Sequence, residues 1–233
     1  MLKVKIFTLY PEVFNGLLNS GLYKKALDKK IWKLEILNIR DYADDKHKTV
    51  DDFPFGGGSG MLMRPDILAK ALDSNLSQDD KKFYLSPRGK VLNQKIVKNL
   101  AKEKKINIIC GHFEGIDQRV LETRNIEELS IGDFILSGGE SAAIVLLDAV
   151  IRLLPGVLGN EKSSKDESFE NGLLEYPQYT KPQNWEEKRP PEVLLSGDHA
   201  KIKHWRLSQS EAITRRQRPD LWKKYLEKKN EKY

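Results

Sequence analysis

The chain has 233 residues, a formal net charge of +6 and one cysteine, Cys110. One cysteine cannot form an intramolecular disulfide, which excludes a secreted fold held together by disulfide bonds and leads us to expect a reducing compartment, the cytoplasm. The amino-terminal stretch carries lysines among its apolar residues and runs directly into Pro11, so it predicts neither a signal peptide nor a membrane-spanning helix, and we expect no membrane partner.

Short apolar runs alternate with stretches of helical spacing in the first half of the chain. This alternation predicts an α/β fold, a sheet covered by helices. The predicted strands are residues 4–9, 32–38, 82–85 and 106–110. The predicted helices are residues 11–29, 65–76, 93–104 and 140–154, and Pro155 and Gly156 end the last of these.

The composition of the chain changes after residue 159. Residues 159–170 (GNEKSSKDESFE) are polar and have no apolar periodicity, which is typical of a linker or a mobile loop. Proline-punctuated loops follow, and then residues 198–209 and 219–229 have helical character. We therefore expect a first domain at residues 1–159, a flexible linker at 160–172, and a small, basic, mainly helical domain at 173–233.

The positive charge is concentrated at the carboxyl end. Between Asp198 and Tyr233 there are 11 basic and 5 acidic residues, and this difference equals the +6 of the whole chain. Such a segment favours a polyanionic partner, nucleic acid before membrane. A solvated helical face with spare lysines explains the charge alone equally well.

Three glycine-rich stretches and one further turn follow or flank predicted strands. They are FGGGSGM at residues 55–61, GHFEGID at 111–117, SIGDFILSGGE at 130–140 and YLSPRG at 84–89. In an open α/β sheet ligands bind beyond the carboxyl ends of the strands, so these stretches together predict a ligand pocket, although each alone could be an ordinary turn. The chain lacks a P-loop and a dinucleotide-binding fingerprint, and its four histidines are scattered, so we expect no dedicated metal cage.

Several motifs follow one another along the chain: HKTVDDFPFGGGSGMLMRP, YLSPRG, CGHFEGIDQRV, SIGDFILSGGE, PGVLG, GLLEYPQYT and LLSGDHAKIKHWR. In sequence and order they resemble the bacterial tRNA (guanine-N1)-methyltransferases of the SPOUT superfamily. The resemblance covers nearly the whole chain and is weakest at residues 73–81 and after residue 209. It implies transfer of a methyl group from S-adenosylmethionine to N1 of the guanine immediately 3′ of the anticodon in tRNA.

The same resemblance implies the architecture and the assembly. The first domain would be a SPOUT-type α/β sheet with a deep trefoil knot, and the helical second domain would bind the tRNA anticodon stem-loop. A homodimer would build each active site at its interface. The cofactor-binding residues implied are Tyr84, Leu85, Ser86, Pro87, Gly111, Phe113, Glu114, Gly115, Ser130, Ile131, Gly132, Phe134, Leu136, Gly138 and Gly139. Phe113 stands where relatives often have tyrosine.

Methylation at guanine N1 requires a base that removes the N1 proton and a cation that stabilises the charge developing on O6. The resemblance assigns these roles to Glu167 and Arg152. The family motif has aspartate where Glu167 stands, so the adjacent Asp166 is the alternative base. A purely structural role is the alternative for Arg152: an ion pair with Asp148, four residues earlier, and a favourable charge at a helix end.

The resemblance also assigns contacts with the RNA. Asp51 would recognise a base, although an ordinary acidic turn explains it as well, and Glu114 would help to place a magnesium ion. The residues expected to bind phosphates are Lys201, Lys203, Arg206, Arg215, Arg216 and Arg218. Two rivals stay open: a non-catalytic RNA-binding protein, and a related knotted methyltransferase that acts on ribosomal RNA or on a ribose hydroxyl.

Overall fold

The computed structural model describes residues 1–18, 21–158 and 167–230. The chain divides into two compact units, Met1–Gly159 and Asn160–Tyr233. Asp166 lies outside the described residues, as does most of the predicted linker. Among the described residues, the structure contains no helix with the length and apolar character needed to cross a membrane.

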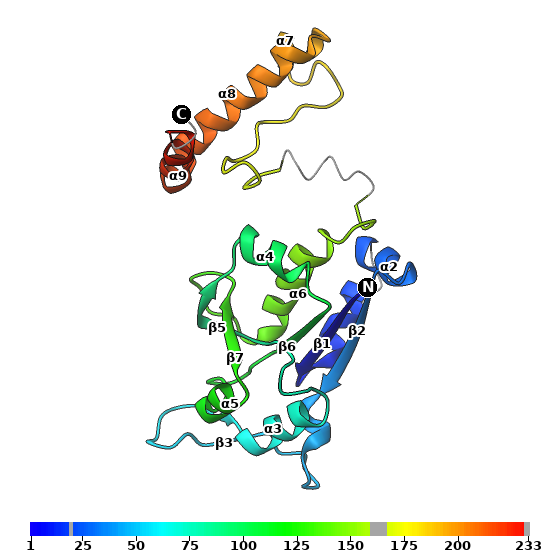
Figure 1. The fold of residues 1–233 in the computed structure, drawn as a ribbon, viewed down its shortest axis with the longest axis vertical. Helices are drawn as coiled ribbons and strands as arrows, with labels where there is room; N and C mark the ends of the chain where they lie inside the picture. Colours follow the sequence, from blue (N-terminus) through cyan, green and yellow to red (C-terminus); the bar gives the residue numbers. More distant parts are fainter. Residues whose placement is uncertain (19–20, 159–166, 231–233) are drawn as a thin grey trace. The chain divides into compact units, whose positions relative to one another are not determined.

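A parallel sheet of five strands forms the centre of the first unit (Figure 1). Its strands stand in the order β2-β1-β6-β5-β7, and every pairing within it is parallel. Their bounds are β1 Leu2–Thr8, β2 Trp32–Asn38, β5 Lys82–Val91, β6 Lys105–Ile109 and β7 Ile126–Ser130. The prediction of an α/β fold is therefore confirmed.

Helices cover both faces of this sheet (Figure 1). Alternate strand residues point to opposite faces, so Phe83 and Tyr84 belong to two different hydrophobic clusters. One cluster packs under α2, α4 and α6, and the other packs under α3 and α5. The helical bounds are η1 Pro11–Phe14, α1 Asn15–Leu18, α2 Gly21–Asp28, η2 Ile39–Tyr42, α3 Pro65–Asp73, α4 Gln94–Leu100, α5 Gln118–Thr123 and α6 Gly139–Ile151.

Several predicted elements need correction. The single helix predicted at residues 11–29 is divided into η1, α1 and α2, and Gly21, at the start of α2, has a φ of +57°. Strand β5 runs to Val91, well past the predicted end. Strand β7 was missed because it is an edge strand with two glutamates among its five residues, which leaves little apolar pattern. Helix α5 was missed because it has only six residues.

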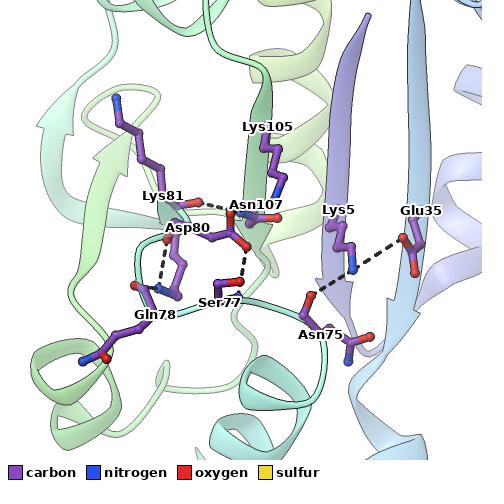
Figure 2. A network of polar contacts seen from close by, with 10 residues as sticks. Lys5, Glu35, Asn75, Ser77, Gln78, Asp80, Lys81, Lys105 and Asn107 are labelled. Carbon is purple, nitrogen blue, oxygen red and sulfur yellow. Dashed lines mark hydrogen bonds and ion pairs between the residues drawn. The ribbon is translucent and has the colours of Figure 1, made fainter.

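A row of polar residues crosses the face of the sheet that α3 covers (Figure 2). Lys5, Asn107 and Lys82 are neighbours in register on β1, β6 and β5. Lys82 Nζ donates to the carbonyl oxygens of Gln78 and Asp80, both at 2.9 Å. Asn107 Nδ2 donates to the Lys81 carbonyl at 2.7 Å, and Lys5 Nζ donates to the Asn75 carbonyl at 2.9 Å. These bonds hold the turn between α3 and β5 against the sheet.

The second unit contains three helices among its described residues: α7 Glu192–Leu195, α8 His199–Gln217 and α9 Pro219–Asn230. Helix α8 is longer than the predicted 198–209, because its second half is polar and has no apolar stripe from which an end could be predicted. Asp198 caps it by accepting hydrogen bonds from the backbone N–H groups of Ala200 and Lys201. The buried Thr214 hydroxyl accepts from the Leu174 N–H at 2.8 Å, which fastens the preceding segment to α8.

Candidate cofactor-binding site

A cavity of about 530 Å³ opens beside the strands β5, β6 and β7. Three segments that lie far apart in the sequence form most of its wall: one lies within β5, one follows β6 and one follows β7. Every residue that the motifs assign to the cofactor lines this cavity. The sequence analysis missed further lining residues, namely Leu62, Arg88, His112, Ile116, Gln118, Leu129, Ile135, Ser137 and Ala142. His112 and Arg88 stand inside the motifs and could have been found there as polar side chains between assigned neighbours.

The first segment is an excursion within β5. Strand β5 pairs with β7 as far as Leu85 and resumes at Lys90, and both of these residues pair with Leu129. The residues between them therefore leave the sheet and contribute Ser86, Pro87 and Arg88 to the cavity wall. Gly89 returns the chain to the sheet, where a Cβ would lie 2.4 Å from the Glu128 carbonyl carbon. Only glycine permits so close an approach of two backbones.

The second segment follows β6 and packs around Tyr84. A Cβ on Gly111 would lie 2.6 Å from the Tyr84 ring, and Gly115, with a φ of +115°, passes beside the Tyr84 hydroxyl. Burial raises the pKa of the Tyr84 hydroxyl above its ordinary value. Phe113 has a left-handed backbone with a φ of 59°, and 45% of its side chain is exposed. The segment thus holds a strained residue at the mouth of the cavity.

The third segment leads from β7 into α6. A Cβ on Gly138 would lie 2.3 Å from His112 Cε1, and a Cβ on Gly139 would lie 2.7 Å from Cys110 Cα. The Gly139 N–H donates to the Gly111 carbonyl at 2.9 Å, which joins the second and third segments. The glycines here are explained by this close contact, which no side chain could enter.

Three polar side chains meet beside the cavity where β1, β6 and α6 converge. Glu140 is buried in the first turn of α6, and its Oε2 lies 2.6 Å from His112 Nε2. The Thr8 hydroxyl donates to Glu140 Oε1 at 2.5 Å and accepts from the Tyr10 N–H at 2.9 Å. Burial, and then the nearby Glu140 carboxylate, raise the pKa of the Cys110 thiol well above its ordinary value.

A short hairpin carries Asp51 and the first glycine-rich stretch. Its strands, β3 Asp51–Asp52 and β4 Leu62–Met63, pair Asp51 with Met63 and Asp52 with the cavity residue Leu62. The Met63 N–H donates to the Gly115 carbonyl at 3.0 Å, and the Glu114 N–H donates to the Met61 carbonyl at 2.9 Å. The base of the hairpin is therefore fastened to the second cavity segment.

Comparison with known proteins decides the family. A family model described as "tRNA (Guanine-1)-methyltransferase TrmD" matches residues 2–224. The chain belongs to this family. It is 71% identical over 230 residues to the tRNA (guanine-N(1)-)-methyltransferase of Pelagibacter ubique, across 99% of this chain and 100% of the relative. The proteins of the same name from Bartonella henselae and Rhodospirillum rubrum are 55% and 52% identical, across 96% and 97% of this chain and 96% and 94% of the relatives.

The two catalytic residues expected from the TrmD resemblance lie in different units. Arg152 is the half-buried C-cap of α6 in the first unit, and its backbone N–H donates to the Asp148 carbonyl. The Asp148 carboxylate accepts a hydrogen bond from the Tyr23 hydroxyl. Glu167 is a half-buried residue of the second unit. The assignment of Glu167 or Asp166 as the base stays a prediction.

The basic residues expected to contact RNA lie along α8 and at its end. Lys201 pairs with Asp198 at 3.2 Å, Arg218 pairs with Asp220 at 2.7 Å, and the Arg206 guanidinium lies 4.8 Å from the centre of the Tyr176 ring. Lys203, Arg215 and Arg216 are exposed. The rings of Trp205 and Trp222 lie beside Tyr179 and Tyr225, with centres 6.4 and 5.5 Å apart.

Metal ligands were expected only at Glu114. Within residues 1–18, 21–158 and 167–230, the structure contains no group of three or more His, Cys, Asp or Glu side chains that could hold a metal ion. The Glu114 carboxylate lies against Gly60 of the hairpin, where a Cβ would be 2.4 Å from Oε1. The contact packs the glycine-rich stretch on the cavity segment.

Proposed function

We propose that this protein transfers a methyl group from S-adenosylmethionine to N1 of the guanine immediately 3′ of the anticodon in tRNA. The observation that carries the proposal is the single cavity that the three motif segments line together. Residues separated by tens of positions in the sequence meet there, as expected if one ligand is bound by all of them. Membership of the TrmD family supports the same reaction.

The cavity fits a cofactor of this size. Its volume of about 530 Å³ lies within the range of small-molecule pockets, roughly 300–1,000 Å³. Glycines at 111, 138 and 139 keep the wall close-packed, because a Cβ at each would meet neighbouring atoms. Backbone N–H and C=O groups with a few side chains, among them Ser86 and Ser130, suit a ligand with a purine, a ribose and an amino acid moiety.

S-adenosylmethionine, when bound, supplies a methyl group on a positively charged sulfur. Guanine N1 carries a proton at neutral pH, and a carboxylate must accept it as the carbon–nitrogen bond forms and the carbon–sulfur bond breaks. We assign this role to Glu167, with Asp166 as the alternative. Arg152 would stabilise the negative charge that develops on guanine O6.

The residue that we expect to help place a magnesium ion is Glu114. This carboxylate lines the cavity, and Mg²⁺ is commonly bound by one or two carboxylates together with water and substrate oxygens. Since the described residues assemble no larger group of ligands, we derive no step through a metal.

The finer architecture belongs to the same proposal. Residues 1–159 would form a knotted catalytic domain, 160–172 a linker and 173–233 a tRNA-binding domain, in a homodimer with active sites at the interface. The excursion at residues 86–89 supports a threaded chain, because β5 leaves the sheet and re-enters it beside β7. The exposed apolar residues Phe113, Phe134 and Ile135 beside the cavity support a second protomer, since exposed apolar surface of this kind is typical of protein interfaces.

One assay tests substrate and site together. Purified protein is incubated with a labelled methyl donor and an unmodified tRNA transcript that has guanine 3′ of the anticodon. We expect methyl incorporation that is lost when this guanine is replaced by adenine. A non-catalytic RNA-binding protein would bind no S-adenosylmethionine in calorimetry. A methyltransferase for ribosomal RNA or for a ribose hydroxyl would leave this guanine N1 unmodified, and mapping the methylated position separates it.

A further inference from the structure

We propose that Glu140 is a positioning residue for the cofactor, which acts by holding His112 as a wall of the cavity. The inference rests on the proposed binding of S-adenosylmethionine. Neither Glu140 nor His112 belongs to the residues that the motifs assign to the cofactor. The geometry that points to the role is a chain of hydrogen bonds that runs from Tyr10 through Thr8 and Glu140 to His112.

The burial of Glu140 requires an explanation. Only 5% of the residue is exposed. Burial of a carboxylate whose oxygens have no hydrogen-bond donors costs roughly several kcal/mol of folding free energy. Both oxygens have donors here: Oε1 accepts from the Thr8 hydroxyl and Oε2 lies 2.6 Å from His112 Nε2. Its place in the first turn of α6 adds the favourable field of a helix amino terminus. The site is therefore built for a carboxylate.

The three bonded residues come from elements that meet only in the folded chain. Thr8 ends β1, His112 follows β6, and Glu140 begins α6. The carboxylate thus ties the start of the second cavity segment to the sheet and to the helix that follows the third segment. Loss of this tie would remove one link between the two segments, while the backbone bond between Gly139 and Gly111 would still join them.

His112 is the member of this group that lines the cavity. Three neighbours surround its ring. Glu140 Oε2 is bonded to it, Gly138 packs so closely that a Cβ there would clash with it, and the Tyr10 ring lies edge to face with it at 4.7 Å between centres. His112 Nε2 faces Glu140 Oε2 at hydrogen-bonding distance. The orientation of the ring is therefore set by Glu140.

Glu140→Gln tests the proposal. The glutamine amide keeps the size of the side chain, but one of its two polar atoms is a donor, so it cannot accept hydrogen bonds from both Thr8 and His112. We expect the Kd for S-adenosylmethionine, measured by calorimetry, to rise about tenfold or more, as for loss of one charge-assisted hydrogen bond. The KM for the methyl donor should rise in parallel, and the KM for tRNA should stay within about twofold, because the Glu140 side chain is buried.

A double-mutant cycle separates positioning from simple destabilisation. If Glu140 acts through His112, Glu140→Gln should weaken cofactor binding much less in a His112→Ala background than in the wild-type protein. Thr8→Val removes the other donor to the same carboxylate and should weaken binding in the same direction. This variant keeps the test decisive if Glu140→Gln does not fold.

Asn107→Ala is the matched control. Asn107 is as buried as Glu140, and its side chain bonds the turn before β5, away from the cavity residues (Figure 2). It should lower stability and leave the Kd unchanged. Equal losses of affinity from Glu140→Gln in both backgrounds, or unchanged affinity in Glu140→Gln and Thr8→Val, would overturn the positioning role. Failure of the wild-type protein to bind S-adenosylmethionine would instead overturn the proposed function.

Discussion

Lys82 Nζ lies 2.9 Å from the carbonyl oxygen of Gln78, in a side chain that is almost completely buried. The same ammonium group donates to the Asp80 carbonyl, so a single lysine satisfies two backbone acceptors of the turn between α3 and β5. Such a group fastens the turn to the sheet as an internal clamp, because a buried ammonium group must be hydrogen-bonded. The turn depends on a residue of the sheet that it covers.

Lys82→Met should therefore destabilise the fold. The methionine fills the space but leaves the Gln78 and Asp80 carbonyls without this donor, at a cost of about 1–3 kcal/mol in the free energy of unfolding. Urea unfolding measures the change. Lys81→Met is the control: the side chains of Lys81 and its partner Glu103 are 53% and 32% exposed, and loss of this surface ion pair should cost less than about 1 kcal/mol. Equal losses in the two variants would contradict the clamp.

Gly138→Ala should weaken binding of S-adenosylmethionine. The added methyl group would lie 2.3 Å from His112 Cε1 and 2.7 Å from Glu140 Oε2, so the histidine must move within the cavity wall. We expect the Kd to rise about tenfold or more, since overpacking of a filled site costs about 1–3 kcal/mol. Gly16→Ala in α1 meets nothing within 4 Å, and it should leave the Kd unchanged. An unaltered Kd in Gly138→Ala would show that the ring can move freely.

Glu167→Gln should abolish methyl transfer and leave the affinity for S-adenosylmethionine nearly intact. The amide has the shape of the carboxylate but cannot accept the N1 proton at neutral pH. Single-turnover methylation and calorimetry measure the two properties separately. Asp166→Asn is the matched comparison. If it loses turnover while Glu167→Gln keeps it, the base is Asp166.

Arg215→Gln combined with Arg216→Gln should weaken tRNA binding and reduce its dependence on salt. Both arginines are exposed on α8, and each phosphate contact that is lost should lower the slope of log K against log salt by about 1. Filter binding at several salt concentrations measures the slope. Arg119→Gln removes an exposed arginine that pairs with Asp117 in the first unit, and it should leave the slope unchanged. A solvated helical face with spare charge predicts no difference between the variants.

The sequence predicted the elements whose local pattern is strong. Strand β2 begins and ends where expected, and β1 and β6 do so within a few residues, because apolar residues recur along all three of them. Strand β7 was not predicted, because an edge strand can expose glutamates such as Glu127. The full length of α8 was not predicted, because little of this helix is buried.

For the cavity, too, the sequence predicted the features that are local in the chain and missed the contacts between distant residues. The motifs identified the segments that line it, because glycines beside polar residues after a strand are a local pattern. They did not identify the partnership of Glu140 with His112 and Thr8, since these residues are 28 and 132 positions apart in the chain. The order of the motifs also does not decide which of the adjacent residues Asp166 and Glu167 is the catalytic base.

The sequence by itself determined the α/β class, the family and the residue types from which a cofactor pocket could be made, since these follow from local periodicity and from motifs in order. Only the tertiary structure decided the strand order, which places β6, β5 and β7 side by side, and the contacts that make certain glycines obligatory. The physical reason is that a close approach or a buried hydrogen bond joins residues through space, and such pairs leave no periodicity along the chain.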